Sequence, residues 1–257
     1  MIKKILLNRK PCTIQLEIKT NEPQKLWIKV ADSQQDHTFY TKRYSKVDKK
    51  QTFFIRLPQS PKIAELIVYN DNNKDYYNDD SSFKVSNIQI VPLKVNKLKV
   101  SKKTLSFIRF AQEFCEMCGV LEASPKGEVY TSNNGKFRID YFDEIRGSSG
   151  KVVRTPARIS QVNGRIEVSK KAFINFSVPM RMAIILHEYS HFYINENPHS
   201  ETQADINGMR LYLKIGYPRI DAYNVFLNVF KTTDNIESVD RFKNLDTYIK
   251  QHEYNFN

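Results

Sequence analysis

The sequence predicts two domains: an all-β sandwich at the N-terminus, followed by an α+β domain. The net charge changes along the chain, because residues 1–103 hold 21 Lys and Arg against 10 Asp and Glu, whereas residues 104–257 hold 19 against 18. All eight glycines lie at or after Gly119. Short alternating runs fill the first part, and longer helical patterns fill the second. We therefore place the domains at 1–97 and 104–257, with the lysine-rich segment 92–103 as their connection.

Seven short runs rich in β-branched and aromatic residues predict the strands of the first domain. Apolar and polar residues alternate most clearly in 14–18 and 26–30, as expected for strands with one buried face. The turns between the runs use Asn, Asp, Ser and Pro in place of Gly. Seven closely spaced strands are typical of a β-sandwich, and we expect a docking or assembly role for it. The expected strands are residues 2–8, 12–19, 25–31, 37–45, 52–57, 65–70 and 83–91.

The second domain is predicted to combine a small sheet with several helices. The dipeptide Asn163-Gly164 lies between two strand-like runs, which is a strong signal for a β-hairpin. We expect the edge strand of this hairpin to hold an extended peptide by strand addition. Outside the region of the motif described next, the expected elements are a helix at 105–118, a strand at 136–141, hairpin strands at 157–162 and 165–169, and closing helices at 223–230 and 239–249.

Two further helices, joined by a short turn, follow the hairpin. Pro179 favours a helix start near residue 178, and apolar residues then recur at helical spacing up to about Asn195. Ser200 and Gln203 form a capping-box pair that starts the second helix. Gly216 ends that helix.

The first of these two helices carries an H-E-x-x-H motif at residues 187–191. Histidines four residues apart lie on the same face of a helix, so His187 and His191 can bind one zinc ion. Glu188 is then positioned to act as general base on a water bound to that zinc. A catalytic zinc needs three protein ligands and one open position. The turn is long enough to return Glu201, at the start of the second helix, to the metal as the third ligand.

Other residues compete for these roles. His199 is the main alternative to Glu201 as the third ligand, and Asp205 is the next one. Asp205 could instead cap its helix or form a salt bridge with Arg210. Gly208 lies on the same helix face as Asp205 and favours a close approach of the two helices. An oxyanion donor is also needed, and the sequence leaves four candidates: Tyr217, Arg210, Tyr189 and His199.

The motif followed by E-x-x-A-D at 201–205 resembles the zincin metallopeptidases that use a glutamate as third ligand. It is most similar to the zinc peptidases that cleave phage repressors and stress regulators, although the nine residues between His191 and Glu201 are fewer than those families show. The resemblance implies that His187, His191 and Glu201 bind zinc and that Glu188 is the catalyst. It also implies that Asp205 orients a ligand histidine. The segments HEYSHFYIN and ADINGMRLYLKIGYP also resemble zincin-like proteins of crAss-like bacteriophages, which implies a virion component.

Two functions are therefore expected. The first is a zinc metallopeptidase acting on a peptide or protein substrate. The alternative is a structural component of a bacteriophage particle, with the zincin-like domain as a scaffold and the basic domain docking other virion proteins. The basic run 42–50, near Phe39 and Tyr40, also fits nucleic acid. We favour a solvated face with its aromatic residues in the sandwich core.

The cysteines and the apolar segments indicate where the protein is located. Cys115 and Cys118 lie near the end of their helix, where buried reduced thiols are expected, and Cys12 has no evident partner. The apolar run at residues 1–7 is followed at once by Asn-Arg-Lys, so it is not a recognisable signal peptide. No stretch is long enough to cross a membrane. A cytoplasmic or virion-associated location is expected.

Overall fold

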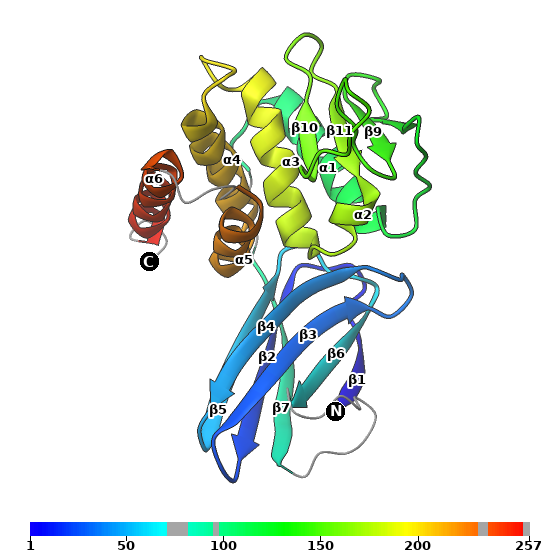
Figure 1. The fold of residues 1–257 in the computed structure, drawn as a ribbon. Coiled ribbons are helices and arrows are strands. Elements are labelled where there is room, and N and C mark those ends of the chain that lie inside the picture. The colour runs from blue at the N-terminus through cyan, green and yellow to red at the C-terminus, as the bar shows by residue number, and fades with distance from the viewer. Residues whose placement is uncertain (71–81, 95–97, 231–235, 254–257) are drawn as a thin grey trace. The chain divides into compact units, whose positions relative to one another are not determined.

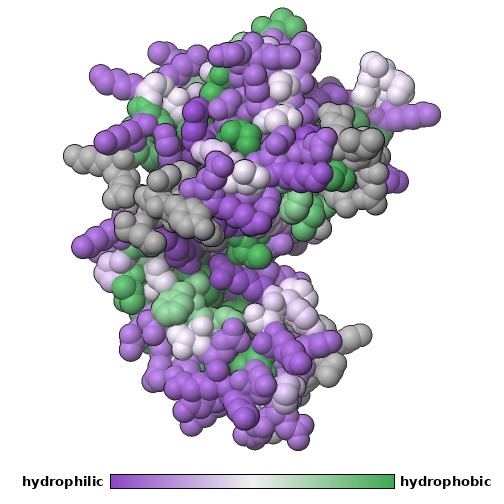
Figure 2. Space-filling view, turned by 90° about the vertical axis from the view of Figure 1, so that its left-hand side faces the viewer, coloured by the Kyte–Doolittle hydropathy of each residue, from purple (hydrophilic) through white to green (hydrophobic). Residues whose placement is uncertain are grey.

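The computed structural model describes residues 1–70, 82–94, 98–230 and 236–253 (Figure 1). The chain forms two compact units, Met1–Lys97 and Leu98–Asn257, and it combines antiparallel sheets with helices. None of the helices in these residues has the length and apolar character that a membrane span requires. Figure 2 shows hydrophilic side chains over most of the face in view.

The described residues of the first unit form seven strands in two antiparallel sheets. One sheet has the order β1-β6-β3-β4, and the other has the order β5-β2-β7. Every expected run is a strand, with small differences at the ends. The bounds are β1 Ile2–Leu6, β2 Cys12–Thr20, β3 Gln24–Asp32, β4 Phe39–Val47, β5 Lys50–Leu57, β6 Ile63–Asn70 and β7 Phe83–Pro92.

Strands β3 and β4 show which aromatic side chains belong to the core. Leu26 and Ile28 of β3 are fully buried, and the residues that alternate with them lie on the outer face of the sheet. On β4, Tyr40 is buried, whereas Phe39 is half-buried and Tyr44 is 43% exposed. The expectation that the aromatic residues near the basic run lie in the core is therefore correct for Tyr40 and wrong for Tyr44.

The second unit contains the expected helices and two short elements that the sequence analysis missed, α2 and β8. Its helices are α1 Lys102–Met117, α2 Lys170–Phe173, α3 Val178–Tyr193, α4 Glu201–Ile215, α5 Arg219–Val225 and α6 Ile236–Glu253. A π-helical turn, η1 Phe226–Phe230, continues α5, so the helix expected at 223–230 is divided between the two. Helix α3 lies between the sheet of this unit and helices α4 and α5 (Figure 1).

That sheet has the strand order β10-β11-β9-β8. The strands are β8 Glu128–Thr131, β9 Arg138–Phe142, β10 Ala157–Ile159 and β11 Ile166–Ser169. Strands β9 and β11 run parallel to each other, whereas β8 and β10 run antiparallel to their neighbours, and β10 forms an edge.

The predicted hairpin is confirmed, but its turn is wider than the expected two residues. Ile159 already pairs with Ile166, so residues 160–165 form the loop. Gly164 has a φ of +70°, and a Cβ added there would lie 2.5 Å from the Tyr193 hydroxyl. The loop therefore packs closely against the end of α3, which explains why it needs a glycine at this position.

One fully buried arginine fixes the first turns of α3. The Arg181 guanidinium donates to the carbonyl oxygens of Phe173 and Cys115, each at 2.9 Å. Because these carbonyls belong to α2 and α1, the arginine ties three helices together. Cys115 and Cys118 of this region are buried free thiols, as expected, and Cys12 of the first unit is also buried and free.

Candidate metal centre

The H-E-x-x-H residues lie on the last turns of α3. The helix begins where the Ser177 hydroxyl accepts from the backbone N–H of Met180 at 3.3 Å. His187 and His191 are both buried, and they lie one turn apart on the face of α3 that meets α4. Gly208 of α4 allows this contact, because an added Cβ would lie 2.9 Å from the backbone nitrogen of His187. The close approach expected for Gly208 is confirmed.

A hydrogen-bonded turn returns the chain from α3 to the start of α4. The Ser200 hydroxyl accepts from the Gln203 N–H at 3.2 Å, as the expected cap requires. The Gln203 side chain accepts from the backbone N–H of Asn197 and so braces the turn, in place of closing a capping box. The Asn195 side chain donates to the Ser200 carbonyl and accepts from Asn207 of α4. These contacts hold Glu201 at the first position of α4.

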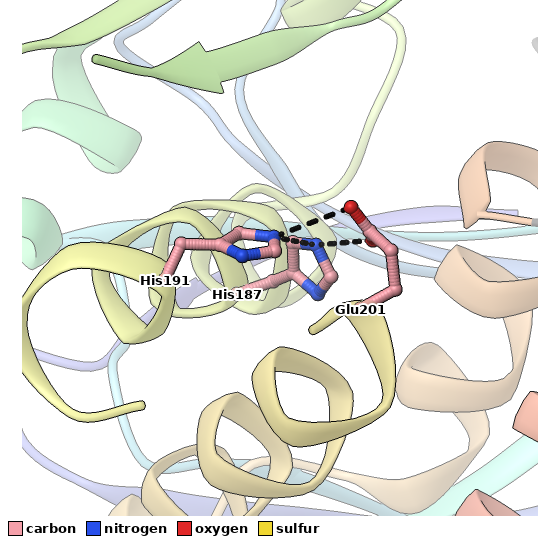
Figure 3. Close-up of side chains that lie close together, drawn as sticks. All are labelled: His187, His191 and Glu201. Carbon is pink, nitrogen blue, oxygen red and sulfur yellow. Dashed lines mark hydrogen bonds and ion pairs between the residues drawn. The ribbon is translucent and has the colours of Figure 1, made fainter. Parts of the chain in front are cut away.

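Three side chains converge at this junction. The Nε2 atoms of His187 and His191 lie 3.1 Å apart. Glu201 places one carboxylate oxygen 3.3 Å from His187 Nε2 and the other 3.5 Å from His191 Nε2 (Figure 3). One ligand atom from each residue lies within 4.8 Å of the others, so the group could hold a metal ion. The Glu201 side chain is 42% exposed, which leaves the cluster open on one side.

The far nitrogens of both imidazoles have oxygen partners. His191 Nδ1 lies 2.8 Å from the Pro198 carbonyl oxygen, which can only accept, so this nitrogen carries the hydrogen. His187 Nδ1 lies 3.0 Å from the Asp205 carboxylate, which fixes the same tautomer. In its neutral form each ring therefore turns an Nε2 lone pair toward the cluster. Two such lone pairs and a carboxylate at these distances repel one another unless a proton or a metal cation lies among them.

Arg241 of α6 is the residue of this site that the sequence analysis missed. Its guanidinium donates to both oxygens of Asp205, at 2.7 and 3.0 Å, and also contacts Glu201 at 3.1 Å. Arg210, which the sequence offered as an alternative salt-bridge partner for Asp205, does not fill that role, because the partner is Arg241. No local pattern could identify Arg241, since it follows Asp205 by 36 residues.

The electrostatics of the cluster favour a bound cation. Burial lowers the pKa of His187, but hydrogen bonds to Asp205 and Glu201 outweigh it and raise that pKa to about 10. The hydrogen bond with His187 lowers the pKa of Glu201 to about 2. Burial and the charge of His187 lower the pKa of His191. The two carboxylates thus hold a proton at His187 when no metal occupies the cluster.

Glu188 lies beside the cluster and has a different environment. It is 9% exposed, and burial, strengthened by the nearby Glu201 charge, raises its pKa to about 7. The backbone N–H of Ile159, at the end of β10, hydrogen-bonds its carboxylate. A carboxyl group with this pKa can accept and release a proton near neutral pH.

The cluster and Glu188 line one cleft of about 480 Å³. Residues 155–159 of the edge strand β10 and its approach form one side, and Arg241 and Ser238 of α6 form another. The remaining lining residues are Gln161, Ile184, His187, Glu188, His191, Glu201 and Val229. An extended segment can therefore reach the cluster along the edge of the sheet.

The other residues that the sequence proposed lie elsewhere. His199 is an exposed residue of the turn and is not part of the cluster. Tyr217 is buried, stacks on Tyr212 and lies 3.5 Å from the Gln112 amide, outside the cleft lining. Tyr189 is buried and stacks on Phe107, and Arg210 is exposed on α4. None of these four proposed oxyanion donors lines the cleft.

No protein-family model matches this chain, and searches of the curated proteins and of the solved structures return no match. A fold by itself does not determine a function. The function is therefore inferred from the chemistry of the cluster and of the cleft around it.

Proposed function

We propose that this chain is a zinc-dependent peptidase, in which His187, His191 and Glu201 bind the metal and Glu188 transfers the proton. The observation that carries the proposal is the convergence of the three ligand atoms within 4.8 Å, beside a buried carboxylate in the same cleft. Two imidazoles and one carboxylate form one of the known ligand sets of catalytic zinc.

The distances between the ligand atoms support zinc as the metal. Zinc binds nitrogen and oxygen at about 2.0–2.2 Å in a tetrahedron, whose edge is then about 3.3–3.5 Å. The two Nε2 atoms lie 3.1 Å apart, and one Glu201 oxygen lies 3.3 Å from His187 Nε2, both close to that edge. The 3.5 Å contact with His191 Nε2 is made by the other Glu201 oxygen. The Nε2 atoms of both imidazoles already face the cluster, and their outer partners hold the rings in place.

In the proposed chemistry, Glu188 carries the proton and the edge strand β10 binds the substrate. When bound, zinc acts as a Lewis acid that polarises the scissile carbonyl and makes the attacking water more acidic. A Glu188 carboxylate oxygen accepts the proton of that water and delivers it to the nitrogen of the leaving amine. Burial raises the pKa of this carboxyl in the metal-free cluster, which favours a role as proton carrier. The edge strand β10 aligns the substrate by strand addition, and the Ile159 N–H holds Glu188 toward the cleft.

In this proposal the two units have different roles. The two antiparallel sheets of the first unit, with side chains of β2 and β3 fully buried, support a β-sandwich that serves as a docking module. The second unit, with an edge strand beside an H-E-x-x-H helix, supports a zincin-like fold.

The test compares two variants of the full chain with the unchanged protein. We expect about one zinc per chain and hydrolysis of an unstructured protein such as casein. Glu188→Gln should retain the zinc and lose turnover by at least about 100-fold, since it removes the proton carrier but no ligand. His187→Ala should lose both zinc and turnover. Zinc-free protein, or turnover equal in Glu188→Gln, contradicts the proposal and favours the scaffold role in a phage particle.

A further inference from the structure

Three aromatic rings form a row across the outer face of the sheet in the first unit. Trp27 of β3 pairs with Tyr44 of β4 on one side and with Tyr69 of β6 on the other. The Trp27 ring centroid lies 4.9 Å from that of Tyr44 and 6.4 Å from that of Tyr69, which is nearly parallel to it. Tyr44 is 43% exposed, so the row reaches the surface.

Two pairs of lysines flank this row on the same face. Lys29 lies directly opposite Lys42, and Lys25 lies directly opposite Lys46. Each pair is two residues along the strands from Trp27, a distance of about 7 Å. Lys25, Lys42 and Lys46 are exposed, and Lys29 is half-buried. We call these four lysines, with Trp27, Tyr44 and Tyr69, the β3–β4 face.

Like charges directly opposite each other destabilise a sheet, so this arrangement has a cost. The Lys42 ammonium lies 4.7 Å from the Trp27 ring centroid, and Lys29 lies 5.5 Å from that of Phe39. Those contacts stabilise two of the ammonium groups but add no negative charge to either pair. Burial and the charge of Lys42 lower the pKa of Lys29, and the charge of Glu65 offsets only part of that shift.

The other sheet of this unit also has two lysines directly opposite each other, but there a carboxylate neutralises them. Lys19 of β2 lies opposite Lys50 of β5, but Glu17 forms ion pairs with both, at 3.6 and 2.7 Å. Among the described residues, no carboxylate forms an ion pair with any of the four lysines of the β3–β4 face. The charge of Glu65 on β6 acts on Lys29, but no carboxylate forms an ion pair with Lys25, Lys42 or Lys46 among these residues, so most of the balancing negative charge is expected from a ligand.

We propose that the β3–β4 face binds a single-stranded nucleic acid, with bases stacked on the ring row and phosphates held by the flanking lysines. A single strand offers both flat rings and regularly spaced negative charges, and such binders combine aromatic platforms with basic grooves. An acidic protein supplies the charge but no series of flat rings. A duplex keeps the faces of its bases stacked inside, so it offers phosphates and base edges but no ring face for stacking. The proposal is independent of the metal centre, which lies in the other unit.

Trp27 is the only tryptophan of the chain, so its fluorescence reports on this face directly. The full chain is titrated with an oligothymidylate and an oligouridylate of about 15 nucleotides, and with a DNA duplex of equal length. We expect both single strands to quench Trp27 and to bind more tightly than the duplex. The logarithm of the affinity for oligothymidylate should fall with the logarithm of salt concentration with a slope of about −3, as four phosphate contacts imply.

Two variants test separately the contribution of the lysine charges and that of stacking on the aromatic rings. The fluorescence anisotropy of a labelled oligothymidylate is the second readout. Lys29→Gln/Lys42→Gln should weaken binding and make the salt slope less steep by about 1.4. Tyr44→Ala should weaken binding by about 5- to 150-fold and leave the slope unchanged. The matched control is Lys10→Gln/Lys84→Gln, which removes the same charge from two exposed lysines outside this face. Circular dichroism checks that all variants are folded.

Three results would each overturn the proposal. The first is the absence of Trp27 quenching and of an anisotropy change with either single strand. The second is equal weakening by the two double variants, which means that only net charge matters. The third is duplex binding as tight as that of the single strands, with no effect of Tyr44→Ala. Loss of peptidase activity or of zinc has no bearing on any of the three.

Discussion

The metal centre and the β3–β4 face both bring charged or polar groups close together, but they do so in different surroundings. At the metal centre, two imidazoles and a carboxylate meet beside buried residues, where electrostatic effects are large. On the β3–β4 face, two lysine pairs meet at a surface where solvent and salt screen them. We therefore expect changes at the first region to alter ligand binding strongly, and changes at the second to have small effects on stability.

The largest expected effect shows whether Glu201 or His199 is the third zinc ligand. Glu201→Gln removes a charged oxygen ligand from the cluster, so we expect zinc affinity to fall by more than the 10–100-fold typical of an outer partner. His199→Gln, the matched change in the turn, should leave zinc affinity unaltered because His199 lies outside the cluster. Competition with a chromophoric chelator measures both affinities. A larger loss of zinc affinity in His199→Gln than in Glu201→Gln would mean that His199 is the ligand and that the observed cluster forms only without metal.

The next effect concerns the partner of His187. Asp205→Asn keeps the size of the side chain but removes the charge that orients and polarises the imidazole. We expect zinc affinity to fall about 10–100-fold. Asp221→Asn changes another buried aspartate, which lies on α5 near Ser177 and outside the cluster, and it is the control. Equal losses in the two variants would point to general destabilisation in place of a specific role for Asp205.

A third prediction tests whether close helix packing sets the geometry of the cluster. An added Cβ at Gly208 meets backbone atoms of His187 at 2.9 and 3.0 Å, which cannot move away easily. We expect Gly208→Ala to destabilise the second unit by about 1–3 kcal/mol from overpacking, reduced by up to about 1 kcal/mol of improved helix propensity. Urea denaturation measures the free energy of unfolding, and chelator competition measures the accompanying loss of zinc affinity.

Gly147→Ala is the control for that change. Its added Cβ would have one neighbour, the Lys151 carbonyl oxygen at 3.9 Å, so ordinary contact is expected. A stable Gly208→Ala variant with unchanged zinc affinity would mean that α3 and α4 can separate without disturbing the cluster.

The two regions also differ in how far the sequence could predict them. His187, His191 and Glu201 belong to one helix pair, whose caps and periodicity are local signals, and these signals predicted both helices closely. The contacts of Glu188 with Ile159 and of Asp205 with Arg241 join distant segments, and no local spacing encodes them. The β3–β4 face depends on strand register, and a shift between Val30 and Ala31 changes which β4 residues lie opposite β3. For this reason the sequence indicated a basic aromatic segment but not that Tyr44 lies outside the core.

The smallest expected effect tests the cost of the lysine pairs. Lys46→Gln removes one charge from the pair with Lys25. It leaves the two lysine–ring contacts in place, because Lys29 and Lys42 make them. We expect it to stabilise the first unit by roughly 0.2–1 kcal/mol, because like charges directly opposite are unfavourable. The gain should largely disappear at about 1 M salt, where the Debye length is about 3 Å.

Lys62→Gln serves as the control for this change, since Lys62 is an exposed lysine outside the strands. Thermal unfolding at low and high salt measures both variants. A Lys46→Gln variant that is more stable yet binds oligothymidylate less tightly would show that stability and binding oppose each other on this face. Such an opposition is what a surface kept for an anionic ligand requires, whereas a merely solvated face would gain stability without losing any binding. A salt-independent change, or a loss of stability, would mean that the paired lysines do not repel each other measurably, and the charge argument for this face would then fail.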